Sequence, residues 1–314
     1  MTPRLSTEER SRLLASVNEA PACLMLANFK GGVGKSLTTI QLAAALARLG
    51  LRVLVIDFDP QANATRRLGI EMDPANPIPT ASEVIAANET GVAEDAVVAC
   101  GWADDDGNPT AEAQLIDVVP ARYDLINREG EAGNVGAIRR LQKALTGEWL
   151  KKYDVVLIDT RPDLGHLVQM AMAASNYVLL ITDAAYDGID GAMKVAAFVE
   201  DHADDLYNSS LRVGGVVVSG WDNTNEEKFQ LENLRGYFGD KVWELGIPYT
   251  RVENGEQVPG IRNWIPKWNR LKEADGAAVS LSAWNDKKAR ETVELFDVLA
   301  ERVLREFLTT EVSA

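Results

Sequence analysis

A glycine-rich loop between an apolar run and a helical pattern constrains the fold of this chain more than any other feature of its sequence. Residues 27–39 read ANFKGGVGKSLTT; the run ACLMLAN leads into the loop and SLTTIQLAAALARLG follows it. Consecutive glycines let successive backbone N–H groups point inward, and the following helix offers its positive N-terminal end, so such a loop binds phosphate oxygens. The strand–loop–helix unit therefore predicts a nucleotide-binding α/β fold.

The loop departs at its first position from the usual pattern G-x-x-x-x-G-K-[ST]. Phe29 stands where that pattern has glycine, and the loop carries two lysines, Lys30 and Lys35. In the usual arrangement the lysine at the end of the loop neutralises the β- and γ-phosphates, and the next hydroxyl, here Ser36, ligates Mg²⁺. We therefore expect ATP and Mg²⁺ as cofactors. The other loop residues expected at the nucleotide are Gly31, Gly32, Val33, Gly34 and Leu37.

Apolar runs alternate with helical patterns along most of the chain. Because continuous Val/Ile/Leu runs are typical of strands buried on both faces, the alternation predicts parallel pairing through right-handed crossovers. We expect an α/β fold with a doubly wound, mostly parallel sheet flanked by helices. The predicted strands are 22–28, 52–59, 114–120, 154–160, 177–182 and 212–220, and the predicted helices include 36–50, 136–152 and 188–207.

The chain of 314 residues has no internal repeat or long linker, so we expect one P-loop domain, 21–314, after a short extension, 1–20. Apolar residues at helical spacing predict a C-terminal helix at about 286–308 that packs on the sheet. Residues 101–113 read as an exposed turn.

Acidic residues are concentrated in one block of the chain. Residues 68–121 hold eleven acidic side chains and no lysine or arginine, within a chain whose net charge is −15. We interpret an acidic insertion around 70–113 as a solvated surface, or alternatively as a docking site for a basic partner. The net charge argues against nucleic-acid binding, but its distribution matters more than its sum.

Cysteine content and the N-terminal sequence indicate a cytoplasmic protein. Cys23 and Cys100 are far apart and in no C-x-x-C arrangement, which argues against a disulfide framework or a zinc site. The first twenty residues have no apolar segment typical of an export signal, and no apolar run approaches the length of a membrane span.

Carboxylates follow two of the predicted strands. Asp159 ends the run DVVLID, and a carboxylate there would support magnesium beside a phosphate loop. Asp57 and Asp59, two apart in VLVIDFDPQ, would face the same side if the strand continued through them. One could then orient the attacking water and the other support the metal; alternatively, DFDPQ forms a hydrogen-bonded turn that caps the next helix.

With these residues in view, the chain resembles the ParA/MinD family of deviant Walker ATPases. The matching motifs are KGGVGKS at 30–36, VLVIDFDPQANAT, LIDVVPARYDL and DVVLIDTRPDLG, and the resemblance extends over about residues 22–260. It implies a homodimer on ATP binding, in which Lys30 reaches across to the partner's phosphates. It also implies that Lys35 and Ser36 act within their own chain, that Asp59 positions water and that Asp159 supports Mg²⁺, with Asp57 as an accessory carboxylate.

The resemblance also implies details of the base pocket. The stretch FGDKVWELGIPYTRVEN is similar to the family's segment near the base, which places Pro248 at the nucleotide. The chain differs from the usual family residues at Arg161, Ile181 and Asp183, where proline or alanine, proline, and glutamine are frequent.

A DNA partition ATPase is the function that the resemblance implies. Its ATP dimer would bind DNA non-specifically on the nucleoid and hydrolyse ATP when a ParB-type, centromere-binding adaptor stimulates it. Too few residues precede the first strand for the N-terminal helix-turn-helix domain of longer members. The segment IRNWIPKWNRLK either contacts DNA or folds its tryptophans into the core. Candidate DNA contacts are Arg251, Arg262, Lys267, Arg270 and Lys272.

Two other functions fit the same residues. The switch could position a non-DNA cargo, because the adaptor determines the cargo. A small-molecule ATP-dependent synthetase is a weaker alternative, whose ATP use would depend on a small carboxylate. Iron–sulfur relatives are excluded because no cysteine follows Asp159.

Overall fold

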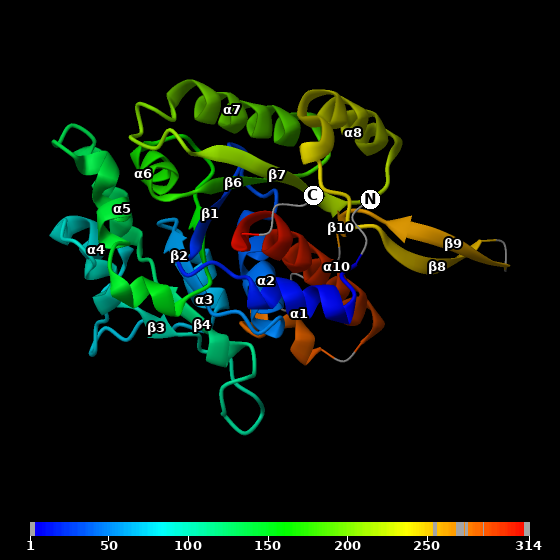
Figure 1. Ribbon diagram of the computed structural model, residues 1–314, viewed down its shortest axis with the longest axis horizontal. Coiled ribbons are helices and arrows are strands. Elements are labelled where there is room, and N and C mark those ends of the chain that lie inside the picture. The colour runs from blue at the N-terminus through cyan, green and yellow to red at the C-terminus, as the bar shows by residue number, and fades with distance from the viewer. Residues whose placement is uncertain (1–3, 254–255, 268–272, 274–275, 285, 311–314) are drawn as a thin grey trace.

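An eight-stranded sheet forms the centre of the fold, with the strand order β10-β7-β6-β1-β5-β2-β4-β3 (Figure 1). The computed structural model describes residues 4–253, 256–267, 273, 276–284 and 286–310. Neighbouring strands pair in parallel except β3 and β4, which are antiparallel at one edge. The strands are β1 (Ala22–Ala27), β2 (Val53–Phe58), β3 (Val98–Ala99), β4 (Ile116–Val119), β5 (Val155–Thr160), β6 (Tyr177–Thr182), β7 (Arg212–Trp221) and β10 (Ile265–Pro266).

Six of these strands coincide with the predicted apolar runs, which confirms the doubly wound, mostly parallel sheet. Every residue of β1, β2 and β5 is buried, as expected for strands covered on both faces. One predicted boundary is wrong at a place that matters for the site. Strand β2 ends at Phe58, so Asp59 lies in the turn beyond the strand.

Helices cover both faces of the sheet (Figure 1). Helices α2 and α10 pack on one face, and α4 to α8 pack on the other. None of the helices in the described ranges is long and apolar enough to cross a bilayer. In chain order the helices are α1 (Thr7–Ala15), α2 (Lys35–Arg48), α3 (Asn63–Arg67), α4 (Ala81–Ala87), α5 (Arg140–Ala144), α6 (His166–Ala174), α7 (Tyr186–His202), α8 (Asn225–Phe238) and α10 (Lys287–Val303).

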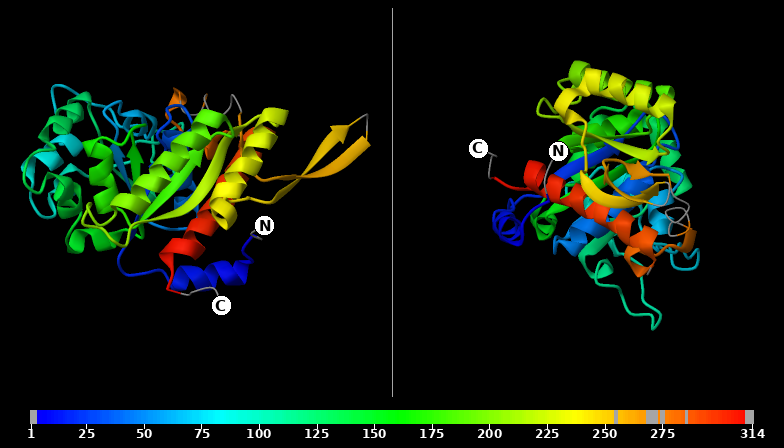
Figure 2. Two further views of the ribbon diagram at one scale, coloured as in Figure 1. Left: turned by 90° about the horizontal axis from the view of Figure 1, so that it is seen from above. Right: turned by 90° about the vertical axis from the view of Figure 1, so that its right-hand side faces the viewer.

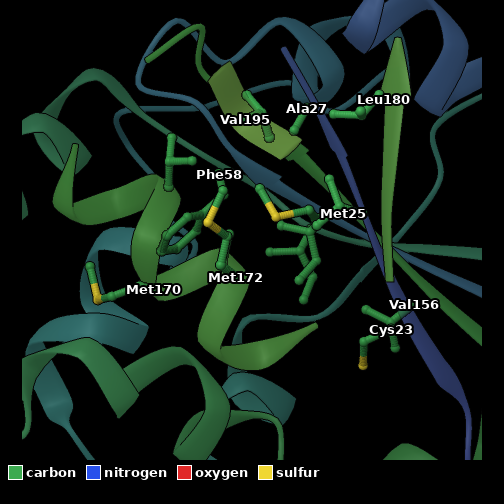
Figure 3. Close-up of a cluster of buried hydrophobic side chains, with 14 of the residues drawn as sticks. Cys23, Met25, Ala27, Phe58, Val156, Met170, Met172, Leu180 and Val195 are labelled. Atoms are coloured by element: carbon green, nitrogen blue, oxygen red, sulfur yellow. The ribbon is translucent and has the colours of Figure 1, made fainter. Parts of the chain in front are cut away.

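The core beside the carboxyl half of the sheet is packed with sulfur-containing and aromatic side chains. Figure 3 shows Met25 of β1, Phe58 of β2 and Met172 of α6 in one cluster, and all three are fully buried. Methionine fills irregular gaps because its unbranched side chain adapts to its neighbours. This packing fixes the strands from which the phosphate loop and the acidic turn emerge.

The N-terminal extension folds against the C-terminal helix. The Leu5 N–H donates to the buried Glu301 carboxylate over 3.1 Å, and Arg10 pairs with the same group. Val17 forms a bridge with Thr309. The predicted C-terminal helix is confirmed as α10 and a π-helical turn, Leu304–Leu308, that continues it. The N-terminal extension therefore packs against the C-terminal helix and the turn that follows it.

The predicted helix over 136–152 is wrong, because the segment is broken. Only α5 is α-helical there, and 3-10 turns at Ala137–Arg139 and Glu148–Lys152 flank it. The break lies at Gly147, whose φ of 132° is outside the helical range.

The acidic segment is folded. Helix α4 lies within it and buries Val84 and Ile85, with Thr80 as its N-cap. The exposed turn at 101–113 is confirmed for its acidic tip, yet Trp102 is buried and donates its indole N–H to the Arg67 carbonyl over 2.7 Å. Several acidic side chains, such as Asp104 to Asp106, are thus exposed on a folded segment, whereas Glu112 is buried and pairs with Arg48.

A β-hairpin projects from the body of the molecule. It consists of β8 (Ile247–Glu253) and β9 (Glu256–Arg262), and Figure 2 shows it extending away from the sheet. The chain has two Ile-Pro pairs here: the first, at 247–248, begins β8 of the hairpin, and the second, at 265–266, follows β9. The second pair forms β10 and returns the chain to the edge of the sheet beside β7.

Candidate nucleotide-binding site

The glycine-rich loop lies at the carboxyl end of β1, where open α/β sheets bind ligands. Gly32 and Gly34 have φ values of 80° and 95°, in the left-handed region that favours glycine. A Cβ on Gly34 would lie 2.8 Å from the Ser219 hydroxyl on β7. Helix α2 begins at the next residue, so its N-terminal N–H groups face the loop.

Lys35 lies inside the loop. Its Nζ donates to the carbonyls of Asn28 and Lys30 over 3.3 and 3.1 Å, and only 7% of the residue is exposed. Burial lowers the pKa of Lys35, and the nearby Asp159 and Asp59 carboxylates offset this effect. A lysine held at the loop's own carbonyls is placed to meet phosphate oxygens in the same loop.

Asp159 and Ser36 supply oxygen donors beside the loop. Asp159 is fully buried at the end of β5, and its Oδ1 accepts from the Thr39 hydroxyl over 3.2 Å. The nearby Ser36 hydroxyl lowers the pKa of this carboxylate, and Oδ2 has no hydrogen-bond partner among the described residues. Burial raises the pKa of Asp159, and the charge of Asp57 raises it further. Because hard oxygen donors suit Mg²⁺, this orphaned oxygen and the Ser36 hydroxyl fit a magnesium shell.

The described residues contain no cluster of three His, Cys, Asp or Glu side chains that could hold a metal by themselves. A magnesium ion here would therefore take most of its ligands from phosphates and water, which is usual for Mg²⁺ at nucleotide sites.

Both carboxylate oxygens of Asp57 accept hydrogen bonds within the chain, and its role as a metal ligand stays a prediction. Its Oδ2 accepts from the Thr65 N–H and hydroxyl over 2.8 and 2.7 Å, and its Oδ1 accepts from the Asp59 N–H. The interpretation of DFDPQ as a hydrogen-bonded turn therefore fits Asp57. Asp59 accepts from the Gln61 N–H in that turn and is 7% exposed, so its predicted role with water stays a prediction.

Lys30 occupies a different position from Lys35. Its Nζ lies 3.2 Å from Oδ2 of Asp183, the residue that follows β6. About a third of each side chain is exposed. The side chain of Lys30 thus lies at the edge of the loop. Asp183 was identified in the sequence only as a departure from the family.

A cavity of about 340 Å³ opens beside the loop. The predicted residues Gly32, Val33, Gly34 and Leu37 line it. From other elements come Asp183, Ser219, Gly220, Glu227, Pro266 and Lys267. Its position next to the loop suits the rest of a nucleotide.

Pro248, which the resemblance placed at the base, does not line this cavity. It pairs with Ile261 in the projecting hairpin, whereas Pro266 lies beside β7 and does line the cavity. The sequence contains two Ile-Pro pairs, and the second, which Lys267 follows, is the one beside the cavity. The placement of Pro248 at the nucleotide stays a prediction.

A larger cavity, of about 1120 Å³, lies beside α3 and is lined by segments 60–72 and 121–124 together with Ala278. It contains no residue of the glycine-rich loop. Size alone is therefore a poorer guide to the nucleotide site than the loop geometry and the buried carboxylate.

The turn after β5 is held by charged contacts that sequence reasoning missed. The Glu129 carboxylate accepts from the N–H groups of His166 and Leu167 over 2.8 and 3.3 Å, and so caps α6. Arg161, one of the departures, pairs with Glu129 over 3.2 Å and with Asp163. Burial lowers the pKa of His166. Nothing in the local sequence around 129 indicated this long-range cap.

The structure places two of the five candidate DNA contacts, one in an ion pair and one at the cavity. Arg262 pairs with Glu291 over 3.2 Å and lies over the Tyr249 ring, and Lys267 lines the cavity beside the loop. Trp264 is 6% exposed and packs near Trp221, so this tryptophan folds into the core. Arg270 and Lys272 lie outside the described residues, as does the side chain of Arg251.

Comparisons with known proteins agree with this geometry. A family model described as an AAA domain matches residues 22–213. The chromosome-partitioning ATPase Soj of Thermus thermophilus is 36% identical over 226 residues, 72% of this chain and 80% of that protein. The chromosome partitioning protein ParA of Myxococcus xanthus is 33% identical over 227 residues, 72% of this chain and 74% of that protein.

Solved structures show the same fold. A Cyanothece McdA variant in complex with ATP superposes with a TM-score of 0.70 at 18% identity, covering 94% of this chain and all of that one.

Proposed function

Because this chain belongs to the ParA/MinD-type family of P-loop ATPases, we propose that it is a DNA partition ATPase whose ATP-bound form is a dimer. The observation that carries the proposal is the placement of its two loop lysines. Lys35 donates to carbonyls inside the loop, whereas Lys30 lies outside it, against Asp183. Of these two lysines, only Lys30 has its ammonium away from the loop carbonyls, so it is the one that would release Asp183 and serve a second nucleotide.

Within one chain, the loop N–H groups and Lys35 hold the phosphates. Ser36 and Asp159 would hold Mg²⁺, which would supply positive charge to the phosphates. Asp59, in the turn beyond β2, accepts a hydrogen bond from the attacking water and orients it. These roles use the orphaned oxygen of Asp159 and leave Asp57 to hold the turn.

Across the dimer, Lys30 of each subunit contacts the γ-phosphate held by the other. A cation that contacts the partner's γ-phosphate stabilises the dimer only while triphosphate is present. ATP hydrolysis would therefore let the dimer dissociate. The ATP dimer binds DNA on the nucleoid of the cytoplasm, and a ParB-type adaptor stimulates hydrolysis. The names of the relatives, Soj and ParA, support this cargo.

A non-DNA cargo is the second candidate, and one observation favours it. Arg262 is paired with Glu291 and Lys267 lines the nucleotide cavity, so two of the expected DNA contacts are engaged elsewhere. The same ATP switch would then position a protein assembly.

Fluorescence anisotropy with a non-specific DNA duplex separates these functions. We expect binding with ATP and Mg²⁺ but not with ADP, and an affinity that falls steeply between about 50 and about 200 mM salt. An ATP dimer that binds no DNA would favour the non-DNA cargo. ATP turnover that requires an added small carboxylate would favour a synthetase and contradict both.

A further inference from the structure

We propose that Asp183 is a positioning residue for Lys30. It holds this lysine against its own chain and so sets the protein concentration at which the ATP dimer forms, an inference that rests on the function proposed above. The contact is direct, since Lys30 Nζ lies 3.2 Å from Asp183 Oδ2.

The sheet brings these two residues together. Strands β1 and β6 are parallel neighbours, with Ala27 in register with Leu180. Lys30 and Asp183 each lie three residues beyond that pair. Because both follow the carboxyl ends of adjacent strands, the pairing is a consequence of the fold.

The backbone beneath the pair is fixed by a buried asparagine. Asn28 donates from Nδ2 to the carbonyls of Ile181 and Gly188, and its Oδ1 accepts from the Lys30 N–H over 2.7 Å. The loop is thus tied both to the end of β6 and to the start of α7. The backbone from which the Lys30 side chain reaches Asp183 is therefore fixed.

Two glycines of α7 make room for this arrangement. A Cβ on Gly188 would lie 1.8 Å from Asp183 Oδ1, and a Cβ on Gly191 would lie 2.3 Å from Asn28 Oδ1. Glycine inside a helix destabilises it relative to alanine. The Asp183 carboxylate can therefore approach this helix closely only because Gly188 has no Cβ, although glycine lowers the stability of a helix.

Lys30 is also the cation that balances the charge of Asp183. Oδ1 of Asp183 is buried and has no hydrogen-bond partner in the described part of the chain, and the residue lines the cavity beside the loop. When Lys30 moves to the partner's phosphate, a carboxylate is left unpaired next to a nucleotide. A partly buried charge without its partner is unfavourable, so the pair opposes dimer formation.

The test is the dissociation constant of the dimer at saturating ATP and Mg²⁺, measured by sedimentation with slowed hydrolysis. We expect Asp183→Asn to tighten the dimer roughly 3- to 20-fold, since two partly exposed ion pairs no longer have to open. Saturating nucleotide removes any effect of the substitution on ATP affinity itself.

Three controls separate positioning from a general charge effect. Asp187→Asn removes the same charge from the exposed first turn of the same helix and should leave the dimer unchanged. The double variant Lys30→Ala/Asp183→Asn should be no tighter than Lys30→Ala, because no lysine is left to release. In the nucleotide-free monomer, the Lys30 amine should react faster with an acylating reagent in Asp183→Asn than in the natural protein.

The outcomes distinguish the two proposals. A natural ATP dimer that Asp183→Asn does not tighten overturns the role of Asp183 alone. An unchanged reactivity of Lys30 overturns the contact on which that role depends. The absence of any ATP dimer of the natural protein overturns the proposed function and the restraint with it.

Discussion

Asp57 and Asp159 are register partners on the adjacent strands β2 and β5, both fully buried, yet their carboxylates are satisfied differently. Asp57 receives three hydrogen bonds from the turn and helix that follow it. Asp159 keeps one oxygen without a partner among the described residues. The fold thus uses one carboxylate to build the site and leaves the other available to a cation.

This difference predicts a pH-dependent stabilisation by Asp159→Asn. Burial raises the pKa of Asp159 to about 7, whereas an unfolded aspartate titrates near about 4. The folded state therefore binds more protons between these values, and the contribution of Asp159 to stability is present at low pH and is lost as pH rises to about 7. An amide avoids that loss. Asp159→Asn should raise Tm at about pH 8, by roughly 2–4 °C for each kcal/mol gained, and much less at about pH 5.

Asp57→Asn is the matched comparison for that experiment. Burial also raises the pKa of Asp57, to about 6. An amide has a single oxygen, however, so when that oxygen accepts from Thr65, the amide nitrogen faces the Asp59 N–H and one donor loses its acceptor. This substitution should therefore lower Tm at about pH 8. If both variants shifted Tm in the same direction, the contrast between the two carboxylates would be wrong. Nucleotide binding with Mg²⁺ should weaken in Asp159→Asn despite its greater stability.

Gly34→Ala should impair nucleotide binding. The residue has a φ of 95°, and a Cβ would press on the Ser219 hydroxyl at 2.8 Å, so the loop must shift. We expect ATP affinity to fall at least about tenfold, which corresponds to about 1.4 kcal/mol. Calorimetric titration with ATP measures this effect. Gly50→Ala, at a φ of 89° but in open space beyond α2, should cost stability and leave ATP affinity unchanged.

Lys267→Ala and Pro248→Ala test where the nucleotide cavity lies. Lys267 lines the cavity, so its loss should weaken ATP binding by roughly 3- to 10-fold, the range expected for one charge-assisted contact. Pro248 lies on the hairpin, and its substitution should change affinity less than twofold. If Pro248→Ala weakened ATP binding more than Lys267→Ala, the base would bind near Pro248, as the family resemblance implies.

Glu129→Ala should destabilise the turn after β5. The carboxylate caps α6 through the His166 and Leu167 N–H groups and pairs with Arg161. Loss of such a cap costs about 0.5–2 kcal/mol. Urea denaturation should show that loss, while Glu148→Ala, an exposed carboxylate paired only with Lys151, should be neutral. Equal stability of the two variants would contradict the capping role.

The sequence predicts the sheet and the loop well because their signals are local. Buried parallel strands are continuous apolar runs, and the loop residues must be glycine where φ is positive. Contacts between distant segments are less predictable. The Asp57 bonds to Thr65 and the Glu129 cap depend on where loops return, and the choice between Pro248 and Pro266 depends on a hairpin that the periodicity did not reveal.

The family resemblance implies different roles for Lys30 and Lys35, whereas neither it nor the loop sequence indicates the partner of Lys30 within its own chain. Only the register of β1 with β6 shows that Asp183 meets Lys30. A residue that first appears as a departure from a family pattern can thus acquire a physical role once the neighbouring strand is known.

The central claim is that Lys30 contacts the γ-phosphate of the nucleotide bound to a second subunit. Light scattering after size exclusion tests this claim most directly. With a slowly hydrolysed ATP analogue and Mg²⁺, the natural protein should be a dimer and Lys30→Ala a monomer that still binds the analogue. Lys194→Ala, an exposed lysine of α7, should dimerise normally. A Lys30→Ala protein that dimerises as tightly as the natural chain would contradict the account.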